Sequence, residues 1–165
     1  MNSELASAIG ATIAGAAVLY ILIAVALAVL MIIAYWKIFT KAGEKGWKSI
    51  ILFYNGHVMY KITWKPLWFW LLLAAAVVCS AFESKYSADQ SVMAYGIIAI
   101  VAGIFEVVII IKQLVYLSKS FGKSGGFAVG LLLLPVIFYP ILAFGSAKYI
   151  GNAYQLKSAP KAEEQ

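Results

Sequence analysis

An acidic residue, Glu106, lies near the centre of a long apolar run that extends from about residue 92 to 117. An ionisable side chain at the middle of a membrane helix costs at least about 2.5–3.5 kcal/mol on insertion scales, and such residues mark functional sites by default. Gly103, Ile110 and Gln113 recur on the same helical face as Glu106. We therefore interpret Glu106 and Gln113 as a candidate intramembrane site that faces other helices rather than lipid.

The environment of Glu106 decides what this carboxyl group does. No lysine is expected at its depth, so we expect a neutral carboxyl that is hydrogen-bonded inside the protein. Two partners are expected at a matching depth: Tyr20 in the first apolar run, and the carbonyl of Leu131, which Pro135 frees from its helical bond. Two interpretations stay open. Glu106 makes a helix-packing hydrogen bond, worth about 0.6 kcal/mol, or it serves a proton or a ligand.

A second group of polar residues, Tyr54, Asn55 and His57, lies in the short apolar stretch 50–62. This stretch is too short to span a bilayer, which favours an interfacial or re-entrant element. The Asn55-Gly56 pair is a turn signal and predicts a bend. We treat the three residues as a candidate interfacial site, with an ordinary wet surface histidine as the alternative.

Other familiar chemistry has little support. The single Cys79 lies inside an apolar run and the single histidine is far from it, so neither a disulfide nor a metal site is expected. Gly122-Lys123-Ser124 resembles the end of a phosphate-binding loop, but Leu117 stands where that motif needs glycine. We expect no cofactor, no metal and no nucleic-acid partner.

Composition indicates that lipid is the solvent of this protein. Hydrophobic residues make up 64% of the 165 residues and charged residues 12%, against about 45–50% and about 25% in soluble domains. The sequence predicts an all-α membrane protein with one domain over 1–152 and a polar tail over 153–165. Four transmembrane helices are expected at about 9–35, 66–82, 92–117 and 127–145, with the interfacial element at 50–62.

Lysine placement predicts the orientation. Lysines are dense between the first two spans and sparse over 83–90, where only Lys85 occurs. The positive-inside rule then puts the first and third loops in the cytoplasm and both termini outside, although Lys148, Lys157 and Lys161 favour the opposite side for the tail. Close helix packing is expected at small residues: Gly103, Gly122, Gly126 and Gly130. The lipid bilayer, a second copy or another membrane protein are the expected partners.

Several short sequence segments, given at the end of this paragraph, together resemble a family of small bacterial integral membrane proteins of unknown function. Some members of that family are labelled signal peptidase I. The resemblance covers roughly Tyr35 to Gly151 and implies a multi-pass protein of the bacterial inner membrane. It departs at Leu52, where the family pattern has proline. The segments are Ala34-Tyr-Trp-Lys-Ile-Phe-Thr-Lys-Ala-Gly43, Gly46-Trp-Lys-Ser-Ile-Ile51, Phe53-Tyr-Asn55, Ser118-Lys-Ser-Phe-Gly-Lys123, Gly126-Phe127 and Phe138-Tyr-Pro-Ile-Leu142.

The peptidase label can be examined against the residues. Signal peptidase chemistry needs a serine nucleophile and a lysine base within reach of each other, on a domain outside the membrane. Lys48-Ser49 and Lys123-Ser124 are adjacent pairs in presumed cytoplasmic loops, and adjacent helical side chains do not face each other. We therefore expect no Ser/Lys hydrolase activity.

Three functional hypotheses follow. The first is a non-enzymatic accessory or assembly subunit, which the small-residue helix faces favour. The second is an oligomeric transporter or channel subunit that uses Glu106 and the proline-broken last span. The third is a membrane peptidase, which only the label of the similar proteins favours. The substrate, the partner and the oligomeric state stay open at this stage.

Overall fold

The computed structural model describes residues 2–86 and 92–158, and every regular element in these two ranges is helical. The predicted all-α fold is confirmed to that extent. Two helices are long and apolar enough to cross a membrane by length and composition, Ser7–Lys41 and Gly96–Ser120. The elements in chain order are α1 Asn2–Lys41, η1 Gly46–Ser49, α2 Leu52–Thr63, α3 Leu67–Tyr86, α4 Val92–Ser120, α5 Gly125–Leu133, α6 Pro135–Phe144 and α7 Ala153–Ser158.

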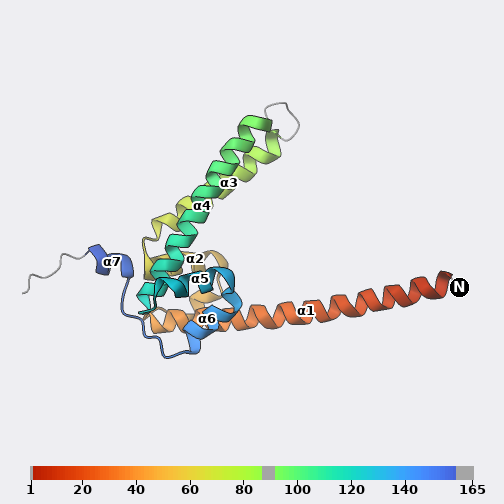
Figure 1. Ribbon diagram of the computed structural model, residues 1–165, viewed down its shortest axis with the longest axis horizontal. Coiled ribbons are helices and arrows are strands. Elements are labelled where there is room, and N and C mark those ends of the chain that lie inside the picture. Colours follow the sequence, from red (N-terminus) through yellow and green to blue (C-terminus); the bar gives the residue numbers. More distant parts are fainter. Residues whose placement is uncertain (1, 87–91, 159–165) are drawn as a thin grey trace, which may run out of the picture.

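Helix α1 is the longest element. Most of its length stands apart from the other helices (Figure 1). Its 40 residues span ~60 Å at about 1.5 Å per residue, twice the ~30 Å of a hydrocarbon core. The helix ends at Lys41, and Gly43, whose φ is 79°, follows in a C-terminal cap in which Glu44 N donates to Phe39 O at 2.9 Å. It therefore extends past both ends of the predicted span 9–35, because nothing in its polar flanks breaks it.

The stretch around Asn55 and Gly56 is continuous helix, so the predicted bend there is wrong. Asn-Gly favours turns because glycine tolerates unusual backbone angles, but here the glycine serves close packing. A β-carbon on Gly56 would lie 2.2 Å from Phe69 Cε2. The absence of that carbon lets α2 approach the first turn of α3.

Helices α3 and α4 form a hairpin that extends away from the core in another direction than α1 (Figure 1). Residues 83–86 of the predicted loop 83–90 belong to α3, and residues 87–91 lie outside the described ranges. Helix α4 ends at Ser120, and Gly122, whose φ is 66°, lies in the turn that follows, with Lys123 N donating to Ser118 O at 2.9 Å.

The predicted fourth span, 127–145, is two short helices rather than one. Leu134 has φ −133° and ψ 61°, and Pro135 then starts α6 because proline cannot donate a helical hydrogen bond. The rings of Phe127 and Phe138 meet with centroids 5.1 Å apart, and the Phe138 ring also covers Gly130. Helices α5 and α6 thus fold back on each other as a hairpin.

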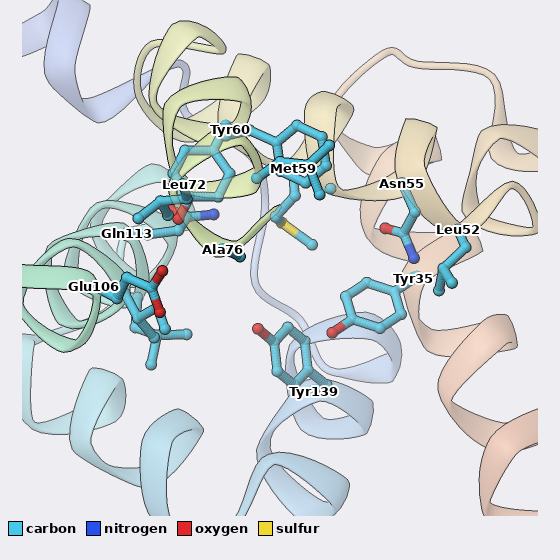
Figure 2. A pocket seen from close by; sticks show the side chains of 15 residues that line it. Tyr35, Leu52, Asn55, Met59, Tyr60, Leu72, Ala76, Glu106, Gln113 and Tyr139 are labelled. Carbon is cyan, nitrogen blue, oxygen red and sulfur yellow. The ribbon is translucent and has the colours of Figure 1, made fainter. Parts of the chain in front are cut away.

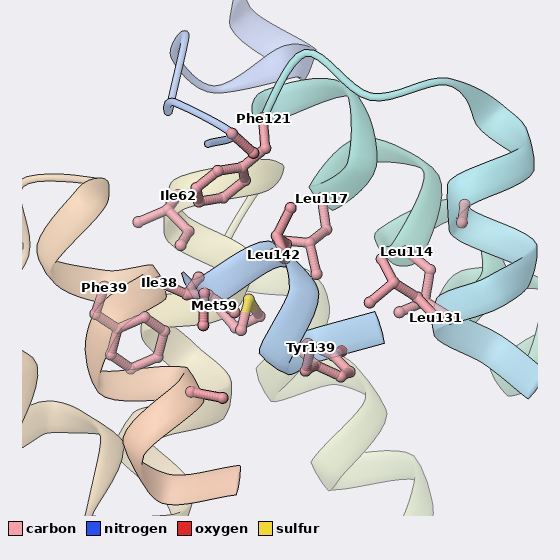
Figure 3. Close-up of a cluster of buried hydrophobic side chains, with 14 of the residues drawn as sticks. Ile38, Phe39, Met59, Ile62, Leu114, Leu117, Phe121, Leu131, Tyr139 and Leu142 are labelled. Carbon is pink, nitrogen blue, oxygen red and sulfur yellow. The ribbon is translucent and has the colours of Figure 1, made fainter. Parts of the chain in front are cut away.

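The apolar core lies where the C-terminal ends of α1 and α4 meet this hairpin (Figure 3). Four of its side chains have no exposed surface, those of Ile38, Phe39, Leu117 and Leu142, and Leu131 has almost none. Ile38 and Phe39 come from the last turns of α1, Leu117 from α4, Leu131 from α5 and Leu142 from α6. The core therefore joins segments that lie far apart in the sequence.

The C-terminal segment packs against the same end of the molecule. Ile150 N donates to Ser120 O at 2.8 Å, and Tyr149 Oη donates to Ile62 O at 2.6 Å. Asn152 Nδ2 donates to the carbonyl oxygens of Lys61 and Trp64, both at 2.8 Å. Residues 153–158 of the predicted tail form α7, and residues 159–165 lie outside the described ranges.

Candidate functional site

A cleft with a volume of about 520 Å³ opens between α1, α2, α3, α4 and α6 (Figure 2). Its walls are mainly apolar and include Leu72, Leu73 and Ala76 of α3 and Ile110 of α4. Volumes of about 300–1,000 Å³ with apolar walls and a few polar groups are typical of ligand sites. The cleft is therefore the candidate functional site.

Glu106 and Gln113 both line this cleft, as neighbours on one face of α4. They are seven positions apart, so Glu106 lies ~10 Å farther along the helix axis. Gln113 is buried and its Oε1 accepts a hydrogen bond from Thr63 Oγ1 at 2.9 Å. Glu106 is half-buried, and its carboxyl group makes no hydrogen bond to any residue that the structure describes. Figure 2 shows the carboxyl pointing into the space of the cleft.

The opposite wall carries three further polar groups. Tyr35 of α1 and Tyr139 of α6 have ring centroids 4.9 Å apart, and Figure 2 shows the Tyr139 hydroxyl pointing into the cleft. Asn55 of α2 lines the cleft as well, and its Nδ2 lies 3.3 Å from Ser49 O. Tyr60 and Phe69 complete the aromatic lining, with ring centroids 6.1 Å apart.

Two residues of the predicted intramembrane site are not brought to the cleft. Tyr20 is 74% exposed on the part of α1 that stands apart from the other helices. Pro135 is exposed at the start of α6 and does not belong to the lining. Tyr35 and Tyr139 take their place. Sequence reasoning missed both tyrosines because Tyr35 is the last residue of the first predicted span, and because the fourth predicted span was taken as one helix.

The predicted interfacial site divides between two surfaces. Asn55 turns to the cleft, whereas Tyr54 and His57 join an exposed aromatic row on the other side of α2. His57 accepts a hydrogen bond at Nδ1 from Trp70 Nε1 at 3.0 Å, which leaves the imidazole proton on Nε2. Trp47 stacks on Tyr54 with ring planes 9° apart. The row positions α2 against α3 through side chains.

The glycines predicted to pack helices have different roles. Gly130 lies under the Phe138 ring, and Gly122 provides the positive φ in the turn that follows α4. A β-carbon on Gly103 would meet no described atom within 4 Å. One on Gly126 would meet only the hydroxyl of Ser124.

The lysine of the Lys48-Ser49 pair is occupied elsewhere. Lys48 Nζ lies 2.5 Å from one oxygen of Glu44, and Lys61 Nζ lies 2.8 Å from the other. Hydrogen bonds from Lys48 and then Lys61 hold the pKa of the Glu44 carboxyl below its usual value. Ser49 Oγ is buried, and it has no hydrogen-bond partner among the described residues.

No group of three or more metal-binding side chains occurs in the described ranges.

Comparison with known proteins identifies one family. A family of unknown function, DUF5684, matches residues 47–152. The chain belongs to this family. The sequence resemblance to a family of unknown function is thereby confirmed. The matched part begins after α1 and includes every cleft residue except Tyr35. No curated protein and no solved structure matches the chain.

Proposed function

We propose that this protein is a multi-pass integral membrane protein of a bacterial inner membrane that acts as a non-enzymatic accessory or assembly subunit. The observation that supports this proposal is the isolation of α1. Its residues from Ser7 to Val29 are all exposed, and almost all are apolar. A helix that is apolar on every side is either buried or surrounded by lipid.

The outer part of α1 has the features of a surface that binds another membrane helix. Ser7, Ala11 and Gly15 are spaced four residues apart, which puts them on one face of the helix. A β-carbon on Gly15 would meet no atom of the described residues within 4 Å. Small residues allow close backbone approach in lipid, where van der Waals packing drives helix association. The partner that fits is a transmembrane helix of another protein in the same membrane.

The proposal includes a topology that differs from the predicted four spans. Helices α1, α3 and α4 cross the bilayer, and the α5–α6 hairpin enters and leaves on one face. At ~14–15 Å each, α5 and α6 are too short to cross a core of ~30 Å. The hairpin begins beside the end of α4 and finishes beside the end of α1. The N-terminus then faces outward and the C-terminal segment lies in the cytoplasm, which also accommodates Lys148 and Lys157.

Exchange of Gly15 for isoleucine tests the role of α1. The tagged protein is extracted from native membranes in mild detergent, and the mass of its complex is measured by native electrophoresis. We expect Gly15→Ile to shift the protein to the mass of a free chain, because a branched side chain separates the two backbones. Ala17→Ile is the matched control, since it places the same side chain on the opposite face of α1. A complex that persists in Gly15→Ile, or is lost equally in both variants, contradicts the accessory role of this face.

A transporter or channel subunit is the second candidate, and the half-buried carboxyl of Glu106 in the cleft favours it. Ionisable residues inside membrane proteins mark ion and substrate paths. Glu106→Gln keeps the size of the side chain and removes its charge. Loss of a cellular phenotype in a folded Glu106→Gln protein whose complex is intact would favour transport over the accessory role.

A further inference from the structure

The cleft has a side-chain composition that the accessory role does not explain. Four aromatic rings line it, from Tyr35, Tyr60, Phe69 and Tyr139, together with the carboxyl of Glu106. No lysine belongs to its described lining, and Lys112, the nearest cation along α4, is exposed on a different face of the helix. The cleft therefore combines one acidic group with several aromatic rings.

The hydrogen-bonding capacity of the cleft is only partly used by the protein. Gln113 Oε1 is taken by Thr63, but the carboxyl of Glu106 has no hydrogen-bond partner in the described part of the chain. A carboxyl group in a half-buried apolar setting is costly unless a partner is supplied. A cation or a strong hydrogen-bond donor from outside the chain would supply such a partner.

The size of the cleft distinguishes two kinds of occupant. One turn of a helix about 10 Å wide and 5.4 Å in pitch fills ~420 Å³, so a volume of about 520 Å³ holds little more than one turn. A spanning helix has about five or six turns. The cleft volume therefore suits a compact small molecule better than a whole transmembrane segment of a partner.

We propose that this cleft binds a lipophilic organic cation, a molecule with a charged nitrogen or phosphorus centre carrying apolar substituents. The faces of tyrosine and phenylalanine rings attract such cations, most strongly where water is excluded. With the cation bound, Glu106 carries the counter-charge, in place of the neutral and hydrogen-bonded carboxyl expected from the sequence, and the aliphatic side chains of α3 and α4 contact the substituents. This inference rests on the proposed membrane location, because the cleft opens between helices that lipid would otherwise cover.

Tetraphenylphosphonium is the probe for the test, and tetraphenylborate is the matched control ligand, with the same shape and the opposite charge. The full chain is purified, placed in lipid nanodiscs and titrated with each ion by isothermal calorimetry, with empty nanodiscs as the blank. We expect saturable binding of one phosphonium ion per chain and no saturable binding of the borate. Equal binding of the two ions would overturn the inference, because an apolar cleft alone does not discriminate charge.

Two variants locate the binding in the cleft. Glu106→Gln should weaken phosphonium binding at least tenfold, whereas Glu4→Gln, the same exchange at an exposed position on α1, should leave it unchanged. Ala76→Leu keeps the carboxyl and fills part of the cleft, so it should also weaken binding. Unchanged affinity in both folded cleft variants rejects the inference. If Glu106→Gln does not fold, the comparison of the two ions and Ala76→Leu decide.

The result separates this inference from the proposed function. A chain that incorporates into nanodiscs and binds neither ion disproves the cation site and leaves the membrane location intact. A chain that does not incorporate into nanodiscs contradicts the membrane location itself.

Discussion

The ammonium group of Lys41 donates to the carbonyl oxygen of Leu142 at 2.9 Å and to that of Gly145 at 2.8 Å. Lys41 lies in the last turn of α1, and Leu142 in the last turn of α6. These carbonyls belong to the helix end that has no intrahelical donor, so the lysine serves as a C-terminal cap from another helix. The contact holds the ends of α1 and α6 at the same level.

Removal of this cap is expected to destabilise the protein. Lys41→Met keeps the length and apolar stem of the side chain and removes its hydrogen bonds to the Leu142 and Gly145 carbonyls. Hydrogen bonds to charged groups are each worth about 1.5–3 kcal/mol, and partial exposure reduces this, so we expect a loss of about 1–2 kcal/mol in the free energy of unfolding. Thermal denaturation in detergent measures the loss. Lys45→Met, at an exposed position, is the control, and equal melting temperatures for the two variants would contradict the capping role.

The side of the membrane on which each segment lies can be measured with single cysteines in a Cys79→Ala background. Glu4→Cys, Lys45→Cys and Ser158→Cys place thiols at exposed positions. An impermeant thiol reagent applied to intact cells should label Glu4→Cys alone, and all three should react after lysis. Labelling of both Glu4→Cys and Ser158→Cys in intact cells would restore the four-span topology and refute the re-entrant hairpin.

The fit of Phe69 against α2 predicts the effect of a single carbon atom. In Gly56→Ala the new carbon would lie 2.2 Å from the ring, and overpacking of this kind costs about 1–3 kcal/mol. Gly103→Ala makes the same exchange in a helix where nothing lies within 4 Å, so it should be neutral or stabilising by about 0.5–1 kcal/mol. Unfolding of both variants under the same conditions gives the comparison. A Gly56→Ala protein as stable as Gly103→Ala would show that the two helices do not approach so closely.

Glu44 makes part of the stability dependent on pH. Its pKa is lowered in the folded protein by Lys48 and Lys61, so its contribution is present above the unfolded carboxyl pKa and is lost as the pH falls through the folded value. We expect Glu44→Gln to melt at a lower temperature than the native protein at pH 7. The two melting temperatures should converge as the pH falls below about 4, near the ordinary pKa of a glutamate side chain, because Glu44 is then protonated and loses its ion pairs. A difference that stays constant from pH 7 to pH 3 would exclude an ionic role for Glu44.

The helical content and the positions of α1, α3 and α4 along the chain could be predicted, because long apolar runs can be recognised in a single sequence. The presence of Glu106 and Gln113 on one face of α4 followed from helical periodicity alone. The pairing of Tyr35 with Tyr139 could not be predicted, because it depends on how α6 folds back onto α1. Hydropathy counted residues 127–145 as one span, whereas the break at Leu134–Pro135 and the Phe127–Phe138 contact produce a hairpin.

The place of the α5–α6 hairpin also sets an order for folding. Lys41 and Leu142 are separated by 101 positions, and the hairpin contacts both α1 and α4. Ile38, Phe39 and Leu117 therefore lack their covering side chains until the last part of the chain has been synthesised. Contacts between residues so far apart in the sequence form late, because closing the long loop between them costs entropy before the contacts add stability. A nascent chain that stalls before Pro135 leaves this core open, which makes it a substrate for membrane quality control.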